Sequence, residues 1–375
     1  MRVLHVIPSL AEQSGGPAAA IVPMCRALQT QGIEPLIVTT NEGRPQADTE
    51  DLLDFEGVPV RFFPVQLGAS YKYSRPLATW LGKNVKDFDL VHVHAVFNHA
   101  SVAAARACRG AGVPYVVRPL GTLDPWSMKQ KRVRKRLFWF LFAKRLLAAA
   151  AAVHYTAAAE KTATEAYLGM NHGYVVPLGV NLNGSTHDDS VANYFPELAR
   201  EPYILSLSRL HPKKRLDELI EAFQSLGDQR WRLVIAGDGP ADYLSFLNQK
   251  ARGSERISFT GWVEGKRKEA LMRGASLFVL PSRHENFGLS VVEAMACSVP
   301  VMVTPQVNLA REIDSAQAGW VVAFKELSNG LAVVMEDNGE RLRRGKVAYE
   351  YAKRYSWDKV GTDLADFYRQ ILERL

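Results

Sequence analysis

The sequence predicts an α/β protein with two doubly wound domains, and three observations support this fold class. Short apolar runs rich in β-branched residues alternate with helical patterns along the chain, which is typical of parallel sheets covered by helices. At 375 residues the chain is too long for one ordinary core. The alternation is interrupted by a polar, turn-rich stretch at 181–201, which we interpret as a linker.

These patterns define the expected domains. We expect an N-terminal Rossmann-like domain at 1–190, a second Rossmann-like domain at 191–356, and a C-terminal helix at 357–375 that packs back on the first domain. Two such sheets facing each other would create a cleft, and open α/β sheets bind ligands at the carboxyl ends of their strands. Functional side chains are therefore expected in the loops that follow strands.

The elements follow in order. The first half begins with a strand at 3–7, a helix at 17–31 that Gly32 ends, and a strand at 35–40. Its remaining strands are expected at 60–65, 90–96, 115–120, 153–158 and 174–180. The second half repeats the pattern with a strand at 203–210, a helix at 215–226, and strands at 232–237, 257–261, 276–282, 300–304 and 319–324.

Composition indicates a cytoplasmic globular protein, 47% apolar and 23% charged. Cys25, Cys108 and Cys297 match no metal-ligand or C-x-x-C spacing, so we expect reduced thiols. The N-terminal apolar run is typical of a buried strand rather than a signal peptide, and no run of about 18 apolar residues predicts a membrane span. The net charge of +7 is concentrated in 129–145, which holds eight Lys and Arg and no acid.

Two glycine-containing loops are candidate anion sites. Gly15 and Gly16 precede Pro17 at the start of a predicted helix, where free N–H groups favour an anion. Gly237 and Gly239 follow a predicted strand in the second half. Neither loop completes G-x-G-x-x-G, which disfavours a nicotinamide or flavin cofactor. A plain strand-to-helix turn remains an alternative for both.

A cationic loop follows the first strand of the second half. Arg209 lies just past the strand, and Lys213, Lys214 and Arg215 come before the next helix. Cations at the carboxyl edge of a parallel sheet suit phosphate oxygens, since Arg contacts two at once and Lys supplies a point charge. The alternative is a solvated basic loop.

Glu285 and Glu293 form the most informative pair. In one continuous helix they would lie about 12 Å apart, too far for a glycosidase carboxylate pair. Phe287 and Gly288 interrupt the segment, so we expect Glu285 in a loop, Ser290 as the helix cap, and Glu293 in the first helical turn. One anion flanked by two hydroxyl-binding carboxylates fits this arrangement. Alternatively, Glu293 complements the helix dipole.

The combination resembles family 4 retaining glycosyltransferases of the bacterial surface-polysaccharide type. The stretch "ENFGLSVVEAMACSVPV" is similar to their E-x7-E signature, and "SGG", "VHVH", "SRLHPKK", "AGDGP", "FTGWV", "REI" and "YSWDKVGTDLADFY" follow in the family's order. The resemblance implies the two-domain GT-B fold and metal-independent transfer of a hexose from a nucleotide sugar. It implies no cofactor. Two departures are Ser298 and Arg215, which stand where the family usually has glycine.

The resemblance also implies roles for individual residues. Glu293 would hold the ribose and Glu285 the sugar hydroxyls, while the diphosphate would meet Arg209, Lys214 and the N–H groups of Gly288 and Leu289. His94 would lie near the transferred sugar, unless it is an ordinary core histidine. Further donor contacts are assigned to Gly15, Gly16, Asn286 and Phe287, and the base to Gly237, Trp262 and Val263.

The basic segment 129–147 suggests a partner. Val133, Leu137, Phe140 and Leu141 share one helical face with ordinary core spacing, but the clustered cations and Trp139 also fit an anionic membrane surface. No nucleic-acid motif accompanies the charge. Its start, "RPLGTLDPWSMKQK", resembles transferases that act on lipid-linked acceptors. This resemblance makes Arg118 and Asp124 acceptor-side candidates.

Our leading interpretation is transfer of glucose from UDP-glucose to a lipid-linked oligosaccharide by a protein that lies peripherally on the inner membrane face. A sugar-nucleotide epimerase of similar fold is one alternative. A nicotinamide-dependent oxidoreductase is less favoured because both glycine loops lack the complete fingerprint.

Overall fold

The computed structural model describes residues 1–11, 15–43, 52–68, 70–182 and 190–374. The chain divides into two compact units, Met1–Gly179 together with Trp357–Leu375, and Val180–Ser356. The division falls at 179/180, eleven residues before the position expected from the polar stretch. The reason is local: the Val180 N–H donates to the Tyr355 carbonyl at 2.7 Å, and Val180 forms a parallel bridge with Ser356. Residues 183–189 of the predicted linker lie outside the described residues.

Unit 1 contains an eight-stranded sheet in the order β3-β4-β2-β1-β5-β6-β7-β8. All neighbours pair in parallel except β3 and β4, which form an antiparallel hairpin at one edge. Its strands are β1 (Arg2–Val6), β2 (Glu34–Thr40), β3 (Leu52–Phe55), β4 (Val58–Phe63), β5 (Leu90–His94), β6 (Tyr115–Arg118), β7 (Ala152–Tyr155) and β8 (Gly173–Val175).

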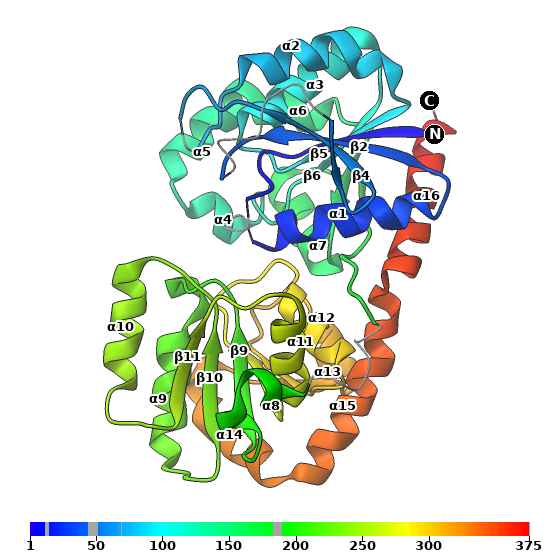
Figure 1. Cartoon of the computed structure of the whole chain (residues 1–375). Helices are drawn as coiled ribbons and strands as arrows, with labels where there is room; N and C mark the ends of the chain where they lie inside the picture. The colour runs from blue at the N-terminus through cyan, green and yellow to red at the C-terminus, as the bar shows by residue number, and fades with distance from the viewer. Residues whose placement is uncertain (12–14, 44–51, 69, 183–189, 375) are drawn as a thin grey trace. The chain divides into compact units, whose positions relative to one another are not determined.

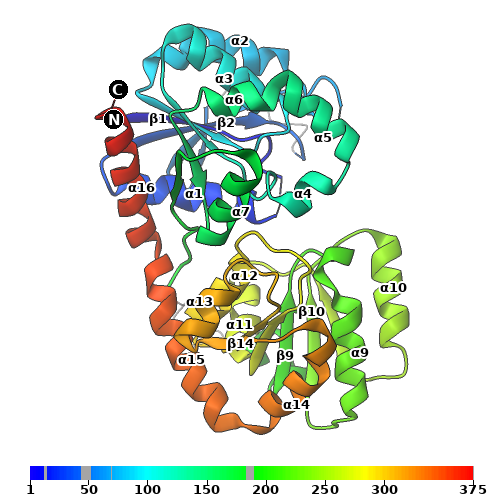
Figure 2. The same cartoon turned by 180° about the vertical axis from the view of Figure 1, so that it is seen from behind.

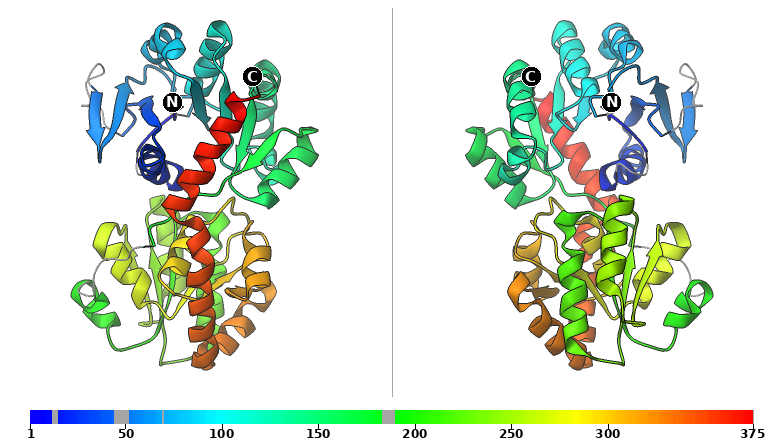
Figure 3. Two further views of the ribbon diagram at one scale, coloured as in Figure 1. Left: turned by 90° about the vertical axis from the view of Figure 1, so that its right-hand side faces the viewer. Right: turned by 90° about the vertical axis from the view of Figure 1, so that its left-hand side faces the viewer.

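Helices cover both faces of this sheet (Figures 1 and 2). One core joins the strands to α2 (Arg75–Asn84), α3 (His99–Ala111) and α6 (Lys144–Ala148). The other joins them to α1 (Gly16–Gln29) and α16 (Trp357–Leu372). Figure 3 shows α16 running along unit 1, and the side chains of Leu364 and Tyr368 are fully buried there. Burial of this amphipathic face explains why the last helix belongs to unit 1.

The segment between β6 and β7 differs from the prediction. It forms α4 (Pro125–Lys129), α5 (Arg132–Phe138) and a π-helical turn at Trp139–Ala143 before α6. The apolar row expected to have core spacing is exposed: Val133 by 84%, Leu137 by 61%, Phe140 by 65% and Leu141 by 59%. Of the two interpretations of this row, burial in the core is therefore excluded. Helical periodicity identifies an apolar face but does not say what covers it.

Unit 2 contains a fully parallel sheet in the order β11-β10-β9-β12-β13-β14. The strands are β9 (Tyr203–Leu207), β10 (Arg232–Ala236), β11 (Ile257–Gly261), β12 (Leu277–Leu280), β13 (Val301–Val303) and β14 (Gly319–Val321). One hydrophobic core joins them to α9 (Leu216–Leu226), α10 (Ala241–Ala251) and α14 (Leu327–Glu336). The other α-helices of unit 2 are α8 (Val191–Tyr194), α11 (Gly265–Gly274), α12 (Leu289–Ala296), α13 (Ala310–Ala316) and α15 (Asn338–Ala352). Unit 1 also contains α7 (Ala158–Leu168).

Within the described part of the chain, no helix has both the length and the hydropathy needed to cross a bilayer.

Candidate active site

The strand order of unit 2 reverses between β9 and β12, and ligands of open α/β sheets bind beyond the carboxyl ends of strands at such a switch point. The loop after β9 carries Arg209, Lys213 and Lys214, and the loop after β12 carries Glu285. The Arg283 N–H donates to the Lys213 carbonyl at 2.8 Å, which joins the two loops. The sequence therefore places its candidate donor-binding residues at the position that the topology favours.

Lys214 and Glu285 form an ion pair in which the Lys214 Nζ donates to the Glu285 Oε2. Their side chains are 9% and 15% exposed. Burial alone would raise the pKa of Glu285, but the charges of Lys214 and Lys213 lower it from 4.5 to about 2. Glu285 is therefore a carboxylate at neutral pH, and it accepts hydrogen bonds from hydroxyl groups, as it does from the Ser282 Oγ at 3.4 Å.

A neighbouring loop fixes the backbone around Glu285. The Glu285 N–H donates to the Gln306 carbonyl at 3.2 Å, and the Asn308 N–H donates to the Glu285 carbonyl at 3.1 Å. The Asn308 Nδ2 also donates to the Asn286 carbonyl at 2.9 Å. Sequence reasoning missed Asn308, because this contact joins loops after two different strands.

The N-terminus of α12 lies between the two glutamates. Gly288 is its N-cap with φ 79°, and the first helical hydrogen bonds run from Val291 and Val292 to the Gly288 carbonyl. The N–H groups of Gly288 and Leu289 have no acceptor among the described residues, which is the property of an anion-binding helix start. Two expectations are wrong: Ser290 lies inside the helix rather than capping it, and Glu293 lies in the second turn.

Both departures from the family's glycines lie in left-handed backbone. Arg215 has φ 52° and Ser298 has φ 61°. The Arg215 side chain turns to Asp217 and Glu218 on α9 and lies over the Phe324 ring. It therefore serves local charge pairing, while the exposed Arg209, the partly buried Lys213 and the buried Lys214 remain the cations of this loop.

Glu293 also has a lysine partner. The Lys268 Nζ of α11 donates to the Glu293 Oε1 at 2.7 Å. Sequence reasoning missed Lys268, because the helical phase of α11 relative to α12 is a tertiary property.

The candidate base contacts lie after β10 and β11. Gly237 has φ 133°, and a Cβ there would lie 1.9 Å from the Ser208 carbonyl oxygen, so this glycine is required by backbone packing alone. Trp262 is 46% exposed and its Nε1 donates to the Glu264 Oε2 at 3.1 Å, whereas Val263 is buried. Of the three candidates, the Trp262 ring is accessible for contact, whereas Gly237 and Val263 are buried.

In unit 1 the strand order reverses between β1 and β5. Gly15, with φ 73°, caps α1 after β1, and its carbonyl accepts from the N–H groups of Ala18 and Ala19. Gly16 is the first helical residue. Residues 12–14 of this loop lie outside the described residues. His94 ends β5, so it lies at the carboxyl edge of the sheet at its switch point.

His94 belongs to a buried group of imidazoles, and its Nε2 lies 3.2 Å from the His5 Nδ1. A second series of hydrogen bonds defines the tautomers of His154 and His92. The Val176 carbonyl accepts from the His154 Nε2 at 2.7 Å, so the His154 Nδ1 accepts from the His92 Nε2, and Tyr368 donates to the His92 Nδ1 at 2.6 Å. Burial lowers the pKa of all four histidines, and that of His5 and His154 to about 3.

The ligand atoms of His5, His92 and His94 lie within 4.8 Å of one another, which is compatible with a metal. The charges around these histidines do not favour a metal. Arg118 is also buried next to these histidines. Burial is the largest cause of the lowered pKa of His5 and His94, and the charge of Arg118 is the second. A divalent cation would meet this guanidinium with no carboxylate among the three ligands. The arrangement favours neutral, hydrogen-bonded imidazoles.

The two acceptor-side candidates are Arg118, which is buried, and Asp124, which caps a helix. Arg118 is 1% exposed, and its Nε and Nη2 atoms have no hydrogen-bond partner among the described residues. Burial lowers its pKa to about 10, while Glu160 opposes the shift. Asp124 is the N-cap of α4, and its Oδ1 accepts from the Trp126 N–H at 2.8 Å. Asp124 therefore shapes the loop after β6, and Arg118 leaves two buried donors unused.

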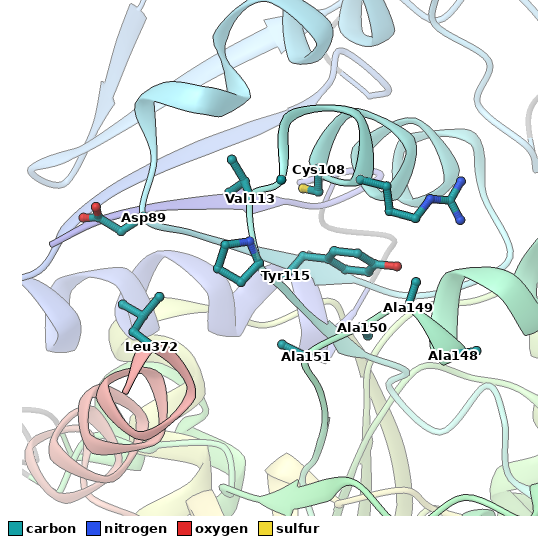
Figure 4. A pocket seen from close by; sticks show the side chains of 12 residues that line it. Asp89, Cys108, Val113, Tyr115, Ala148, Ala149, Ala150, Ala151 and Leu372 are labelled. Atoms are coloured by element: carbon teal, nitrogen blue, oxygen red, sulfur yellow. The ribbon is translucent and has the colours of Figure 1, made fainter. Parts of the chain in front are cut away.

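A hollow of about 630 Å³ lies elsewhere in unit 1. Figure 4 shows Asp89, Tyr115 and Ala151 around it, and these residues lie at the amino-terminal ends of β5, β6 and β7. This is the edge of the sheet opposite to His94, so the hollow is separate from the candidate active site.

Comparisons with known families cover both units. The family described as glycosyl transferase 4-like domain matches residues 15–179, and glycosyl transferases group 1 matches 193–351. A Xanthomonas oryzae protein named GDP-mannose:cellobiosyl-diphosphopolyprenol alpha-mannosyltransferase is 25% identical over 99% of this chain and 97% of its own length. A probable sucrose-phosphate synthase of Thermosipho melanesiensis is 29% identical over 51% of this chain. For this and other curated relatives, the match spans about half of their length.

Solved structures share the fold over the whole chain. Anabaena HepE, in complex with UDP and glucose, matches with a TM-score of 0.79 at 21% identity, covering 100% of both chains. Sucrose-phosphate synthase from Thermosynechococcus elongatus matches with a TM-score of 0.81 at 18% identity, again over 100% of both chains. With the two parallel-dominated sheets, these similarities establish the two-domain GT-B fold.

Proposed function

Because the chain belongs to the glycosyltransferases, with one family model over each unit, we propose that it moves a hexose from a nucleotide sugar to a lipid-linked oligosaccharide. The observation that carries the proposal is the Lys214–Glu285 pair at the switch point of unit 2, beside the free N–H groups that start α12. Cations and N–H groups suit a diphosphate, and a carboxylate suits sugar hydroxyls. The family matches favour this activity over that of a sugar-nucleotide epimerase.

The proposed donor is UDP-glucose. It is supported by HepE, whose structure contains UDP and glucose. GDP-mannose is the rival donor, since the relatives from Xanthomonas oryzae and Komagataeibacter xylinus that match along nearly their whole length are named for it. The same two names specify a diphosphopolyprenol-linked acceptor, which supports a lipid-linked acceptor for this protein.

The proposed reaction retains the anomeric configuration and uses no metal. The bond between the sugar C1 and the diphosphate oxygen breaks, the acceptor oxygen bonds to C1 on the same face, and the acceptor proton passes to the leaving diphosphate. Lys214, Arg209 and the α12 N–H groups stabilise the negative charge that grows on the diphosphate. Glu285 holds the sugar hydroxyls, and positioning supplies much of the rate.

The test is release of nucleoside diphosphate by the purified full chain, with UDP-glucose and GDP-mannose assayed in parallel. A Glu285→Ala variant is expected to lose at least about 100-fold in kcat/KM. The matched control is Glu350→Ala, an exposed glutamate on α15 whose carboxylate pairs with Lys353. Its activity should equal that of the unmodified protein. A fully active Glu285→Ala enzyme would overturn the site assignment.

We further propose that α5 and the π-helical turn after it dock on an anionic lipid surface. The exposed row Val133, Leu137, Phe140 and Leu141 is flanked by the cations of 129–145. Apolar side chains enter the interfacial layer, while each Lys or Arg near the surface contributes about 1 kcal/mol with anionic lipids. A protein on this surface would meet a lipid-linked acceptor without crossing the membrane.

Flotation with phosphatidylglycerol vesicles tests the docking. Binding should occur at low salt and weaken as salt rises. The double variant Leu137→Gln, Phe140→Gln should lose most of it. Val333→Gln is the control, since Val333 is 66% exposed on α14 of unit 2. Absence of binding at low salt, or an equal loss in the control, would remove the proposal.

A further inference from the structure

Lys268 and Glu293 form a half-buried ion pair between two helices of unit 2. The Lys268 Nζ donates to the Glu293 Oε1 at 2.7 Å, and the two side chains are 30% and 25% exposed. The pair joins α11 to α12 and links positions 25 residues apart in the chain. Ion pairs of this exposure contribute little to stability by themselves. We therefore consider how the pair affects the orientation and the charge of Glu293.

Lys268 lies between two parts of the proposed nucleotide site. It is in the first turn of α11, where its N–H donates to the Glu264 carbonyl at 3.2 Å. The Glu264 carboxylate in turn accepts from the Trp262 Nε1 at 3.1 Å, beside the candidate base contacts. On the other side, Lys268 reaches the carboxylate that is the candidate ribose ligand. One short helical turn therefore connects the base loop to Glu293.

Only one of the two carboxylate oxygens of Glu293 has a hydrogen-bond partner among the described residues. Lys268 holds Oε1, and Oε2 makes no hydrogen bond to any described residue. A carboxylate fixed through one oxygen has a defined plane, so the other oxygen is presented in one orientation. Preorganisation of this kind improves binding because less side-chain freedom is lost when the ligand arrives.

Charge supports the same role. A nucleoside diphosphate is an anion, and an uncompensated carboxylate near it would repel it. The Lys268 ammonium offsets the charge of Glu293 while leaving Oε2 as a hydrogen-bond acceptor. The site then accepts a ribose hydroxyl without adding negative charge beside the diphosphate.

We propose that Lys268 is a positioning residue for nucleotide recognition, which orients Glu293 toward a ribose hydroxyl and offsets its charge. The inference rests on the proposed function, since it assigns a partner to the ribose contact of the same site. It extends donor recognition from the E-x7-E segment to α11.

The experiment measures UDP and GDP affinity of the full chain by calorimetry, together with kcat and the KM for the donor that is turned over. Lys268→Met should weaken binding of the cognate nucleoside diphosphate about 10-fold and raise the donor KM similarly, the range for one charge-assisted hydrogen bond. The kcat should change little. Lys268→Arg should restore most of the affinity. The matched control is Lys346→Met, an exposed lysine on α15, which should bind normally.

A double-variant cycle separates positioning from a merely structural role. In a Glu293→Gln background, Lys268→Met should cause no further loss, since its only proposed effect is through Glu293. The single Lys268→Met variant should also discriminate less between the cognate nucleotide and its 2′-deoxy form. Unchanged affinity in Lys268→Met, or a full loss that persists in the Glu293→Gln background, would overturn the inference. Unchanged affinity in Glu293→Gln alone would instead overturn the proposed ribose contact.

Discussion

Replacing Ser298 with glycine should stabilise unit 2, because Ser298 occupies a helix end that favours glycine. The α12 helix ends at Ala296, and Ser298 follows with φ 61°. The Ser298 N–H donates to the Met295 carbonyl at 3.0 Å, and the Val299 N–H donates to the Ala294 carbonyl at 3.0 Å. These two hydrogen bonds define a Schellman motif, in which the left-handed residue is usually glycine.

The expected gain is the difference of two contributions. A residue with a Cβ in left-handed backbone costs about 1–2 kcal/mol, which glycine avoids. Glycine has more freedom in the unfolded chain, which costs about 0.5–1 kcal/mol on folding. The Ser298 side chain is exposed, so little packing is lost. The net expectation is stabilisation by about 0.5–1 kcal/mol, or a rise of roughly 2 °C in Tm for a unit of this size.

Scanning calorimetry of Ser298→Gly provides the measurement, and Gly227→Ser provides a matched reverse. Gly227 ends α9 with φ 62°, and a Cβ there would meet nothing within 4 Å. This variant should lower the Tm by a similar amount without a steric clash. If Ser298→Gly is neutral or destabilising while Gly227→Ser destabilises, the strain assigned to Ser298 is absent and the reasoning fails.

Three further variants test charge and burial by denaturant unfolding. Glu285→Gln should destabilise the protein by about 3 kcal/mol at pH 7, because Lys214 and Lys213 stabilise the carboxylate. Since the pKa of Glu285 is lowered to about 2, this difference in stability should be lost as pH falls from 4.5 toward 2. A difference that does not change with pH would contradict this reasoning. Tyr368→Phe should cost about 1–3 kcal/mol, because the His92 Nδ1 loses its buried donor; an unchanged midpoint would refute the tautomer assignment. Arg215→Ala should destabilise by up to about 1 kcal/mol, since it loses two acidic partners but keeps the left-handed backbone; Arg215→Gly should be less harmful, and the reverse order would argue against strain there.

Buried strands and the helices between them were predictable from the sequence. The strand expected at 3–7 is β1 (Arg2–Val6), and the helix expected at 215–226 is α9 (Leu216–Leu226). Strands buried on both faces of a parallel sheet are continuous apolar runs, which makes them easy to locate. The strand expected at 60–65 is β4 (Val58–Phe63), but its antiparallel partner β3 was not predicted, since Leu52 and Leu53 are 55% and 36% exposed and acidic residues flank them.

The sequence identifies the residues of the candidate site but not the contacts among them. Strand-to-loop order places Lys214 and Glu285 at one edge of the sheet, yet their ion pair joins positions 71 residues apart. Lys268 gave no sequence signal, because a lysine on an amphipathic helix is ordinary and only the packing of α11 against α12 brings it to Glu293. Contacts of this kind depend on helix phase and sheet register, which a single sequence leaves open.

The two lysines explain how the proposed site, with its two carboxylates, would admit a diphosphate. Lys214 compensates Glu285 and Lys268 compensates Glu293, so neither glutamate presents a bare negative charge. The field of the site is then set by what remains, namely Lys213, Arg209 and the N-terminus of α12, all of which attract anions. Each glutamate retains hydrogen-bond acceptor capacity for a hydroxyl. Removing either lysine should therefore weaken nucleotide binding, because the carboxylate that it compensates would then face the phosphates as a bare negative charge.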